Sequence, residues 1–436
     1  MNTQHRLSLG MAILINLNIM MGVGVFINTV ELAKRAGILG GFTYSVVGML
    51  MLPLIASIAT LVGIYPAGGF YTYARQEISP FAGFIGAWSY FIGKLASSSV
   101  GIHVSMLFMQ VLFPALSHIS TFALDALVIS VFTALNMLNL KTGGRIQALF
   151  MSFKTLPVFC AIFGGLFLIY GDPTADWQGI WSGIPSCLPL ALYAVMGFEA
   201  ACSISSKIEN AAKNAPKAIF ISYGIVLAVI VLYQSLFYGA LGHALTGYTD
   251  YRSAFPGLIG ELFANHPQMI HPLIGLLHLG IATSALGGAY GILFSNSWNL
   301  HILAQNNHIP FAHIFTQLNK HQIPFMCVVV EGVMCGIYLT ITQGNTTLLQ
   351  QLGGLGTVLA YTMSVCALIT AKRRDASITL PMAIPVLGLA SCMILISACI
   401  RNFLISGIVS LYAFVLLLAL GTCMYLYTNK ASEVSK

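Results

Sequence analysis

Long apolar runs separated by short polar stretches dominate the pattern along the chain. The runs continue for roughly twenty residues, the length an α-helix needs to cross about 30 Å of hydrocarbon. Strands of a membrane barrel would instead alternate apolar and polar side chains over about ten residues. The pattern therefore predicts about twelve spanning helices, near 8–35, 38–64, 80–113, 121–140, 145–170, 184–207, 218–242, 270–299, 323–343, 347–371, 378–399 and 403–427.

Composition supports an all-α integral membrane protein. Apolar residues make up 57% of the chain and charged residues 7%, whereas a soluble domain carries about a quarter charged residues. Hydrocarbon also forces every backbone N–H and C=O to pair internally, which helices achieve. The longest polar connection, about 243–269, should hold short helices of its own on one membrane face. The basic residues form no block, so a nucleic-acid partner is not expected; the bilayer is the expected surroundings.

The distribution of basic residues predicts the orientation. Of the 19 Lys and Arg residues, thirteen fall in connections and tails on one side of the predicted spans, four on the other, and two, Lys94 and Lys154, within spans. Short cytoplasmic loops carry the excess of Lys and Arg. We therefore expect a multi-pass membrane protein with both termini in the cytoplasm. The compact loops, together with the family resemblance described below, imply the inner (plasma) membrane.

Glycines interrupt the first and sixth predicted spans. Gly22 and Gly24 flank Val23 in the middle of the first, and in the sixth Gly197 stands two residues before Glu199. A helix broken there would expose N–H groups that hold a carboxylate and carbonyls that receive an ammonium. The alternatives are a glycine-lightened packing site in the first span and a structural Glu199 bound to nearby backbone. Interrupted spans at corresponding places in two halves indicate a transporter site.

The chain resembles the amino acid–polyamine–organocation superfamily of permeases and antiporters. The resemblance covers nearly the whole chain and depends on four stretches. The first two are Met21–Phe26, similar to G-S-G-I-F, and Tyr65–Ala74 with Gly83–Trp88, similar to P-x-G-G-x-Y-x-Y and G-x-W. The other two are Gly197–Glu199 with Glu209–Asn210 and Ala215–Ala218, and the loop from Asn306–Pro310 to Pro324, similar to A-R-D-G-x-x-P. Val23 replaces a small polar residue, and the last stretch lacks the usual arginine and glycine. The implied fold is LeuT-like, with inverted repeats at about 8–170 and 184–371 and appended helices at about 378–427.

The resemblance also implies a substrate site. Backbone groups of Gly22, Val23 and Gly24 would bind the substrate carboxylate. Carbonyls near Ile19, Met20, Val195 and Met196, beside Gly197, would take the amino group. Tyr193 would act as an aromatic gate, and Glu199 occupies a carboxylate position proposed as a proton-linked switch. Lys154 matches a lysine of sodium-independent members, whose ammonium would replace a sodium ion and tie the fifth span to the first.

The two intramembrane lysines also indicate a function on physical grounds, apart from the resemblance. Lys154, amid Leu, Phe and Val, must find carbonyls or a carboxylate or lose its proton. Lys94 has three interpretations: it binds an acidic substrate side chain, pairs with Glu199, or reaches a carbonyl for packing. A cation in the pocket disfavours arginine, lysine and polyamines by repulsion, so we expect neutral or acidic amino acids.

The remaining intramembrane polar residues indicate structural roles. Glu331, in a peripheral span, is expected to be structurally paired. His103 and His278 are expected to pack, although either could titrate near neutrality. Asp125, near a span end, should be interfacial.

Several other functions compete with amino acid transport. A membrane-embedded enzyme would need clustered nucleophiles, bases or metal ligands, which the spacing does not offer, so neither catalysis, a cofactor nor a metal is expected. A non-transporting nutrient sensor, or a carrier of cationic amino acids or polyamines, is the alternative. Exchange and proton coupling remain open, as does a homodimer.

Overall fold

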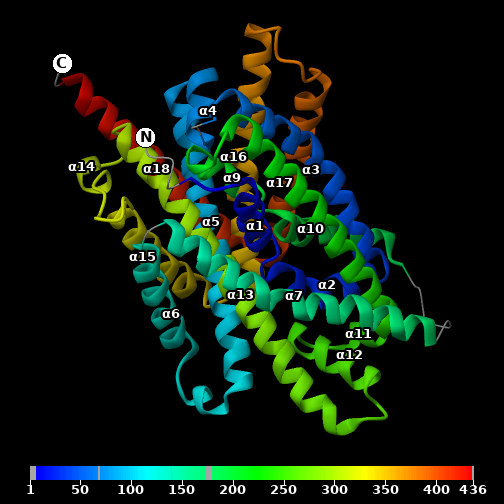
Figure 1. Cartoon of the computed structure of the whole chain (residues 1–436). Helices are drawn as coiled ribbons and strands as arrows, with labels where there is room; N and C mark the ends of the chain where they lie inside the picture. Colours follow the sequence, from blue (N-terminus) through cyan, green and yellow to red (C-terminus); the bar gives the residue numbers. More distant parts are fainter. Residues whose placement is uncertain (1–5, 67–68, 139, 172–178, 435–436) are drawn as a thin grey trace.

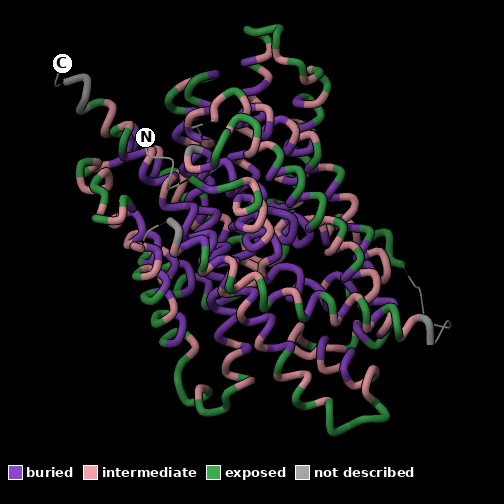
Figure 2. Tube along the Cα trace, in the orientation of Figure 1, coloured by how far each residue is buried: buried purple, intermediate pink, exposed green. Residues whose placement is uncertain are grey.

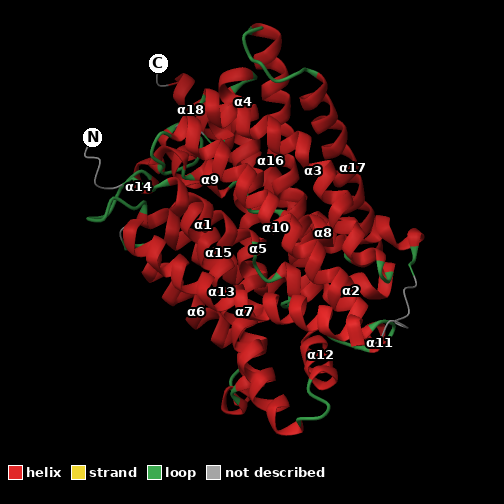
Figure 3. Ribbon diagram, turned by 45° about the vertical axis from the view of Figure 1, so that its right-hand side comes forward, coloured by secondary structure: helices red, strands yellow, loops and turns green. Residues whose placement is uncertain are grey.

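The computed structural model describes residues 6–66, 69–138, 140–171 and 179–434, and within these ranges the chain is helical without a strand (Figure 3). The only sheet-like pairings there are two isolated bridges, Leu7 with Ile208 and Gly37 with Gly179. The all-α prediction is thereby confirmed. Backbone groups pair within each helix, as a hydrocarbon environment requires.

Ten helical segments of the described chain are long and apolar enough to cross a membrane, and the bent pair α1–α2 makes an eleventh. α6 (Thr121–Asn136) is apolar but shorter, so the predicted count of twelve depends on it. The long elements are α1 (Leu9–Met20), α2 (Gly24–Ala36), α3 (Leu39–Ile64), α5 (Pro80–Leu112), α7 (Leu140–Gly171), α8 (Ile184–Val195), α10 (Ala211–Leu241), α13 (Pro267–Gln305), α15 (Phe325–Thr342), α16 (Thr346–Arg374), α17 (Ala383–Ser406) and α18 (Ile408–Val434).

Short helices connect the long ones. They are α4 (Phe70–Glu77), η2 (Pro114–His118), η3 (Trp181–Gly183), α9 (Ala200–Ser203), η4 (Ser205–Lys207), α11 (Ala244–Gly247), η5 (Tyr251–Ser253), α12 (Ala254–Leu262) and α14 (Ala312–Phe315). Three of them lie in the connection 243–269, as the sequence predicts. There the Asp250 side chain caps η5 by accepting from the backbone N–H of Arg252.

α5 is the central helix, packed against α13 and α16 (Figure 1). Glycines permit the close approach: a Cβ at Gly93 would lie 2.9 Å from the Cα of Gly356, and one at Gly101 would lie 2.9 Å from the Ala285 carbonyl oxygen. Small residues at such crossings allow the dispersion contacts that hold membrane helices together. α5 is consequently buried along most of its length (Figure 2).

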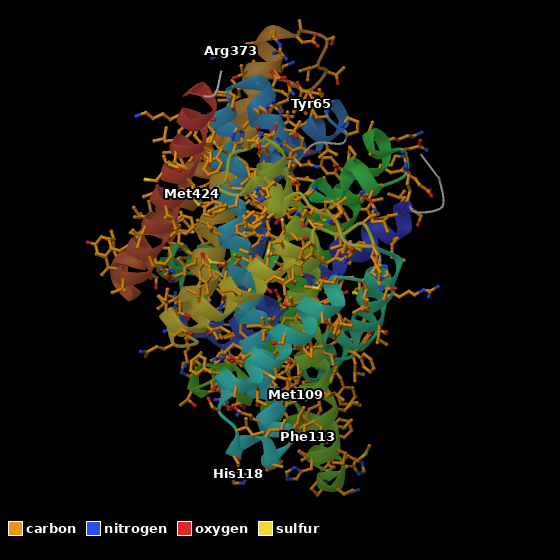
Figure 4. All side chains as sticks on the ribbon, turned by 90° about the vertical axis from the view of Figure 1, so that its left-hand side faces the viewer. Tyr65, Met109, Phe113, His118, Arg373 and Met424 are labelled. Atoms are coloured by element: carbon orange, nitrogen blue, oxygen red, sulfur yellow. The ribbon has the colours of Figure 1, made fainter. Side chains whose placement is uncertain are left out.

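α5 runs from one end of the molecule to the other. Tyr65 and Arg373 lie at one end, whereas Met109, Phe113 and His118 lie at the opposite end (Figure 4). The outer faces of α17 and α18 expose large apolar side chains, among them Leu404, Ile405 and Val409. Such a surface suits lipid contact rather than water.

Candidate substrate site

The first span is broken. α1 ends at Met20, α2 begins at Gly24, and the two helices are bent by 42°. Glycine is required at Gly24 because a Cβ there would lie 2.8 Å from Cδ1 of Tyr193 and 3.2 Å from the Cα of Ala194 on α8. No side chain caps the start of α2, so its first N–H groups form an uncapped, partially positive end.

The sixth span is broken as well. α8 ends at Val195, Met196 is extended, and Gly197 has φ = 121°, a conformation that a side chain disfavours. The chain resumes in the short α9. Both predicted interruptions are confirmed, and they lie against each other: a Cβ on Gly197 would be 3.0 Å from the backbone nitrogen of Met20.

Lys154 binds the end of α1. Its Nζ donates to the carbonyl oxygens of Asn18 at 2.6 Å and Met21 at 3.0 Å, and the hydroxyl of Ser284 donates to the Met21 carbonyl as well. The lysine side chain is fully buried. α7 is thus tied to the break in the first span by the Lys154 amino group, which satisfies carbonyls that the helix leaves without partners.

Lys94 and Glu199 form a buried ion pair. Nζ of Lys94 lies 2.5 Å from Oε1 of Glu199, and the residues are 3% and 0% exposed. The other Glu199 oxygen accepts from the Tyr361 hydroxyl at 2.7 Å and from the Gly197 N–H at 2.8 Å. The Tyr90 hydroxyl donates to Oε1 at 3.3 Å. A buried ion pair is stable when further hydrogen bonds satisfy both charges. Of the three interpretations of Lys94, the structure therefore agrees with pairing to Glu199.

A cavity of about 30 Å³ lies between the two breaks and α5. This is room for only a few water molecules. Eight predicted residues line it: Ile19, Met20, Gly22, Val23, Gly24, Lys94, Tyr193 and Met196. The others lie behind this wall. Glu199 contacts the cavity wall through Lys94. Val195 and Gly197 belong to the second break. Lys154 lies behind the α1 carbonyls.

One wall of the cavity is absent from the sequence prediction. α13 contributes Ala285, Gly288, Ala289 and Ile292, and α5 adds Ser97 and Gly101. These residues are small or apolar and carry no chemical signature. The density of Gly and Ala over 285–291 was the available signal, because small residues mark places where a helix closely approaches another group.

The remaining intramembrane polar residues differ in whether a partner satisfies them. Asp125, near the start of α6, is buried, and its Oδ2 lies 2.7 Å from Nδ1 of His103. His103 is therefore a hydrogen-bonded packing residue, as expected. The expected structural pairing of Glu331 is not found, since among the described residues no ion pair or hydrogen bond reaches its carboxyl oxygens. His278 is buried against Phe108, as expected for packing, although its Nε2 has no hydrogen-bond partner.

An apolar helical bundle with two spans interrupted around a buried polar site is typical of a membrane transporter. Residues 7–427 match the amino acid permease family, to which this chain belongs. An uncharacterized transporter of Mycobacterium tuberculosis is 25% identical over 76% of this chain and 72% of its own length. The aromatic amino acid transport protein AroP of Salmonella typhimurium is 22% identical over 72% of this chain and 69% of its own length. The uncharacterized amino acid permease YtnA of Bacillus subtilis is 25% identical over 75% of this chain and 72% of its own length.

Proposed function

We propose that this protein carries neutral amino acids with apolar side chains across the plasma membrane by alternating access, without sodium. The observation that carries the proposal is the Lys94–Glu199 pair beside the cavity. Because the pair is neutral as a whole, the site offers no net charge to a substrate side chain.

The backbone supplies the groups for a zwitterion. The uncapped start of α2 at Gly22, Val23 and Gly24 suits a carboxylate. Carbonyls at the ends of α1 and α8, from Ile19 and Met20 and from Val195 and Met196, suit an ammonium. Apolar side chains including Ile19, Tyr193 and Ile292 form the rest of the lining and favour an apolar substrate side chain.

The charge of the substrate side chain discriminates among the alternative substrate classes. A cationic amino acid or polyamine would place a positive group near Lys94. An acidic amino acid is the second candidate, because its side-chain carboxylate could take Lys94 from Glu199, but it would then leave Glu199 without its cation. That exchange is unfavourable in a buried site.

Lys154 supports sodium independence, since its ammonium already occupies carbonyls of the broken first span. We expect Lys154→Met, which keeps the stem and removes the charge, to lower transport about tenfold or more, because a charge-assisted hydrogen bond contributes about 1.5–3 kcal/mol. Lys320→Met, at an exposed lysine outside the spans, is the matched control.

The test is uptake by proteoliposomes of radiolabelled leucine, alanine, glutamate and arginine, in sodium and in choline buffer. We expect leucine or alanine to enter equally well in both buffers. Transport of arginine or glutamate alone would refute the substrate class, strict sodium dependence would refute the role of Lys154, and specific binding without flux would indicate a sensor.

A further inference from the structure

Glu331 is another buried carboxyl, in surroundings opposite to those of Glu199. It lies near the middle of α15, is 0% exposed, and neither oxygen accepts or donates a hydrogen bond. No Lys, Arg or His of the described residues forms an ion pair with it. The amide of Asn296 on α13 lies beside the Glu331 carboxyl but outside hydrogen-bonding geometry. Glu199, by contrast, has a cation and three other donors.

A bare ionised carboxylate inside a membrane protein is strongly disfavoured. Taking up a proton removes the charge, and burial without a cation favours that outcome over ionisation at neutral pH. Glu199 and Glu331 are therefore held in opposite states, Glu199 as a carboxylate and Glu331 as a carboxylic acid. Pairs of titratable groups driven apart in this way are a recurring basis of proton chemistry.

Glu331 is connected to the substrate site through the helices it contacts. The Asn296 amide donates to the carbonyl of Phe91, at 3.1 Å, one helical turn from Lys94 on α5. Asn296 also follows the cavity residue Ile292 by one turn on α13. The Ser99 hydroxyl donates to the Cys335 carbonyl, one turn beyond Glu331. A movement of α5 or α13 that opens the cavity must therefore change the surroundings of Glu331.

Among the described residues, the other titratable groups on the packed helices are partnered or lie at the surface, apart from His278, which lies about five turns from Asn296 along α13. No neighbouring charge of that part of the chain therefore holds Glu331 ionised. On α15 itself, Cys327 and Cys335 are neutral thiols and Tyr338 a neutral phenol. On the helices around it, Lys94 pairs with Glu199, His103 with Asp125 and Arg374 with Glu77. Lys372 donates to the Ile378 carbonyl, and His301 contacts the Phe315 carbonyl. His313 and Arg373 are exposed.

We propose that Glu331 is the binding site of a coupling proton, which makes this protein a proton-coupled permease. The proposal rests on the proposed transport function. In each cycle the Glu331 carboxylate accepts a proton from hydronium, leaving water, when the helices expose it to one side of the membrane. It returns that proton to water on the other side, and it is occluded as the neutral acid in between.

The test uses the full-length protein and Glu331→Gln, which keeps the volume and cannot bind the proton. In proteoliposomes, the wild type should accumulate substrate when a pH gradient is imposed and take up protons detected by an internal pH dye. The variant should still exchange internal substrate for external radiolabelled substrate in counterflow. Its accumulation driven by the pH gradient should fall about tenfold or more. Glu261→Gln, at an exposed glutamate outside the long helices, should retain both activities.

A second measurement is independent of transport. The infrared spectrum of the wild type should contain a band of a buried protonated carboxyl that is absent from Glu331→Gln. Accumulation retained by the variant, counterflow lost together with accumulation, or a missing band would each overturn the proposal. Wild-type counterflow without proton uptake would overturn it while sparing the proposed transport function, whereas no wild-type counterflow with any amino acid would overturn that function itself.

Discussion

At the scale of single residues, buried charge in this protein is stabilised by the particular partner each group finds. Lys94 and Glu199 are held ionised by each other and by Tyr90, Tyr361 and the Gly197 N–H. Removing one member leaves a buried charge with fewer partners, whereas removing both leaves a neutral, similarly shaped pair.

We therefore predict strong coupling between these two positions. Lys94→Met or Glu199→Gln alone should each destabilise the protein by about 3–5 kcal/mol, while the double variant should lose much less than the sum. Thermal unfolding of the detergent-purified proteins measures this. Additive losses would show that the two charges do not depend on each other.

His308, outside the long helices, predicts a pH dependence of stability. Its Nε2 lies 2.6 Å from the hydroxyl of Tyr71. Burial, and then the charge of Arg75, lowers the pKa of His308 to about 4, and burial raises the pKa of Tyr71 to about 12. At neutral pH the tyrosine hydroxyl therefore donates and the unprotonated His308 nitrogen accepts.

In the unfolded chain a histidine has a pKa of about 6.5, so as the pH falls the unfolded chain binds this proton at a higher pH than the folded chain does. The contribution of His308 to the free energy of unfolding is therefore complete above about pH 6.5. It declines as the pH falls toward 4. The unfolding temperature should drop over that window, and His308→Gln should make the drop smaller. His118→Gln, at an exposed histidine, should leave the profile unchanged. Identical profiles for wild type and His308→Gln would contradict the assignment.

At the scale of elements, the two breaks depend on backbone that a side chain would obstruct. Gly197 combines φ = 121° with a Cβ position 3.0 Å from Ile19, Met20 and the Met20 nitrogen. We predict that Gly197→Ala lowers transport at least about tenfold and destabilises the fold by about 1–3 kcal/mol. Uptake and thermal unfolding measure the two effects.

Gly224→Ala on α10 provides the matched control, because a Cβ there meets nothing within 4 Å. It should transport normally and gain up to about 1 kcal/mol in stability from helix propensity. Equal effects of the two substitutions would mean that the break does not depend on glycine at position 197.

At the scale of the whole molecule, the thirteen-to-four distribution of basic residues predicts both termini in the cytoplasm. Arg373, one of the thirteen, and His118 lie at opposite ends of the molecule (Figure 4). A fluorescent protein fused after Lys436 should fluoresce, and alkaline phosphatase inserted in the connection 243–269 should be active. The reverse pattern would invert the orientation. The two inverted repeats remain a prediction at this scale.

The fold was largely predictable from the chain, and the site only in part. Span positions follow from the length of apolar runs, and the breaks follow from glycines within them, because both are local properties. The α13 wall was not predictable, since Ala285, Gly288, Ala289 and Ile292 carry no charge or polar group. The surroundings of Glu331 were mistaken because a carboxyl in an apolar span suggests a partner, and only packing shows that the described residues place no cation or hydrogen bond there.

The amino-acid sequence by itself determined that this is a helical membrane protein of the permease family with two interrupted spans, because apolarity, run length and glycine placement act within one segment. Only the tertiary structure decided which partner each buried charge takes. Lys154 and Asn18 are 136 positions apart, and Tyr90 and Glu199 are 109 apart. Such contacts depend on how helices pack across the bundle, and no local pattern encodes whether Lys94 meets a substrate or Glu199.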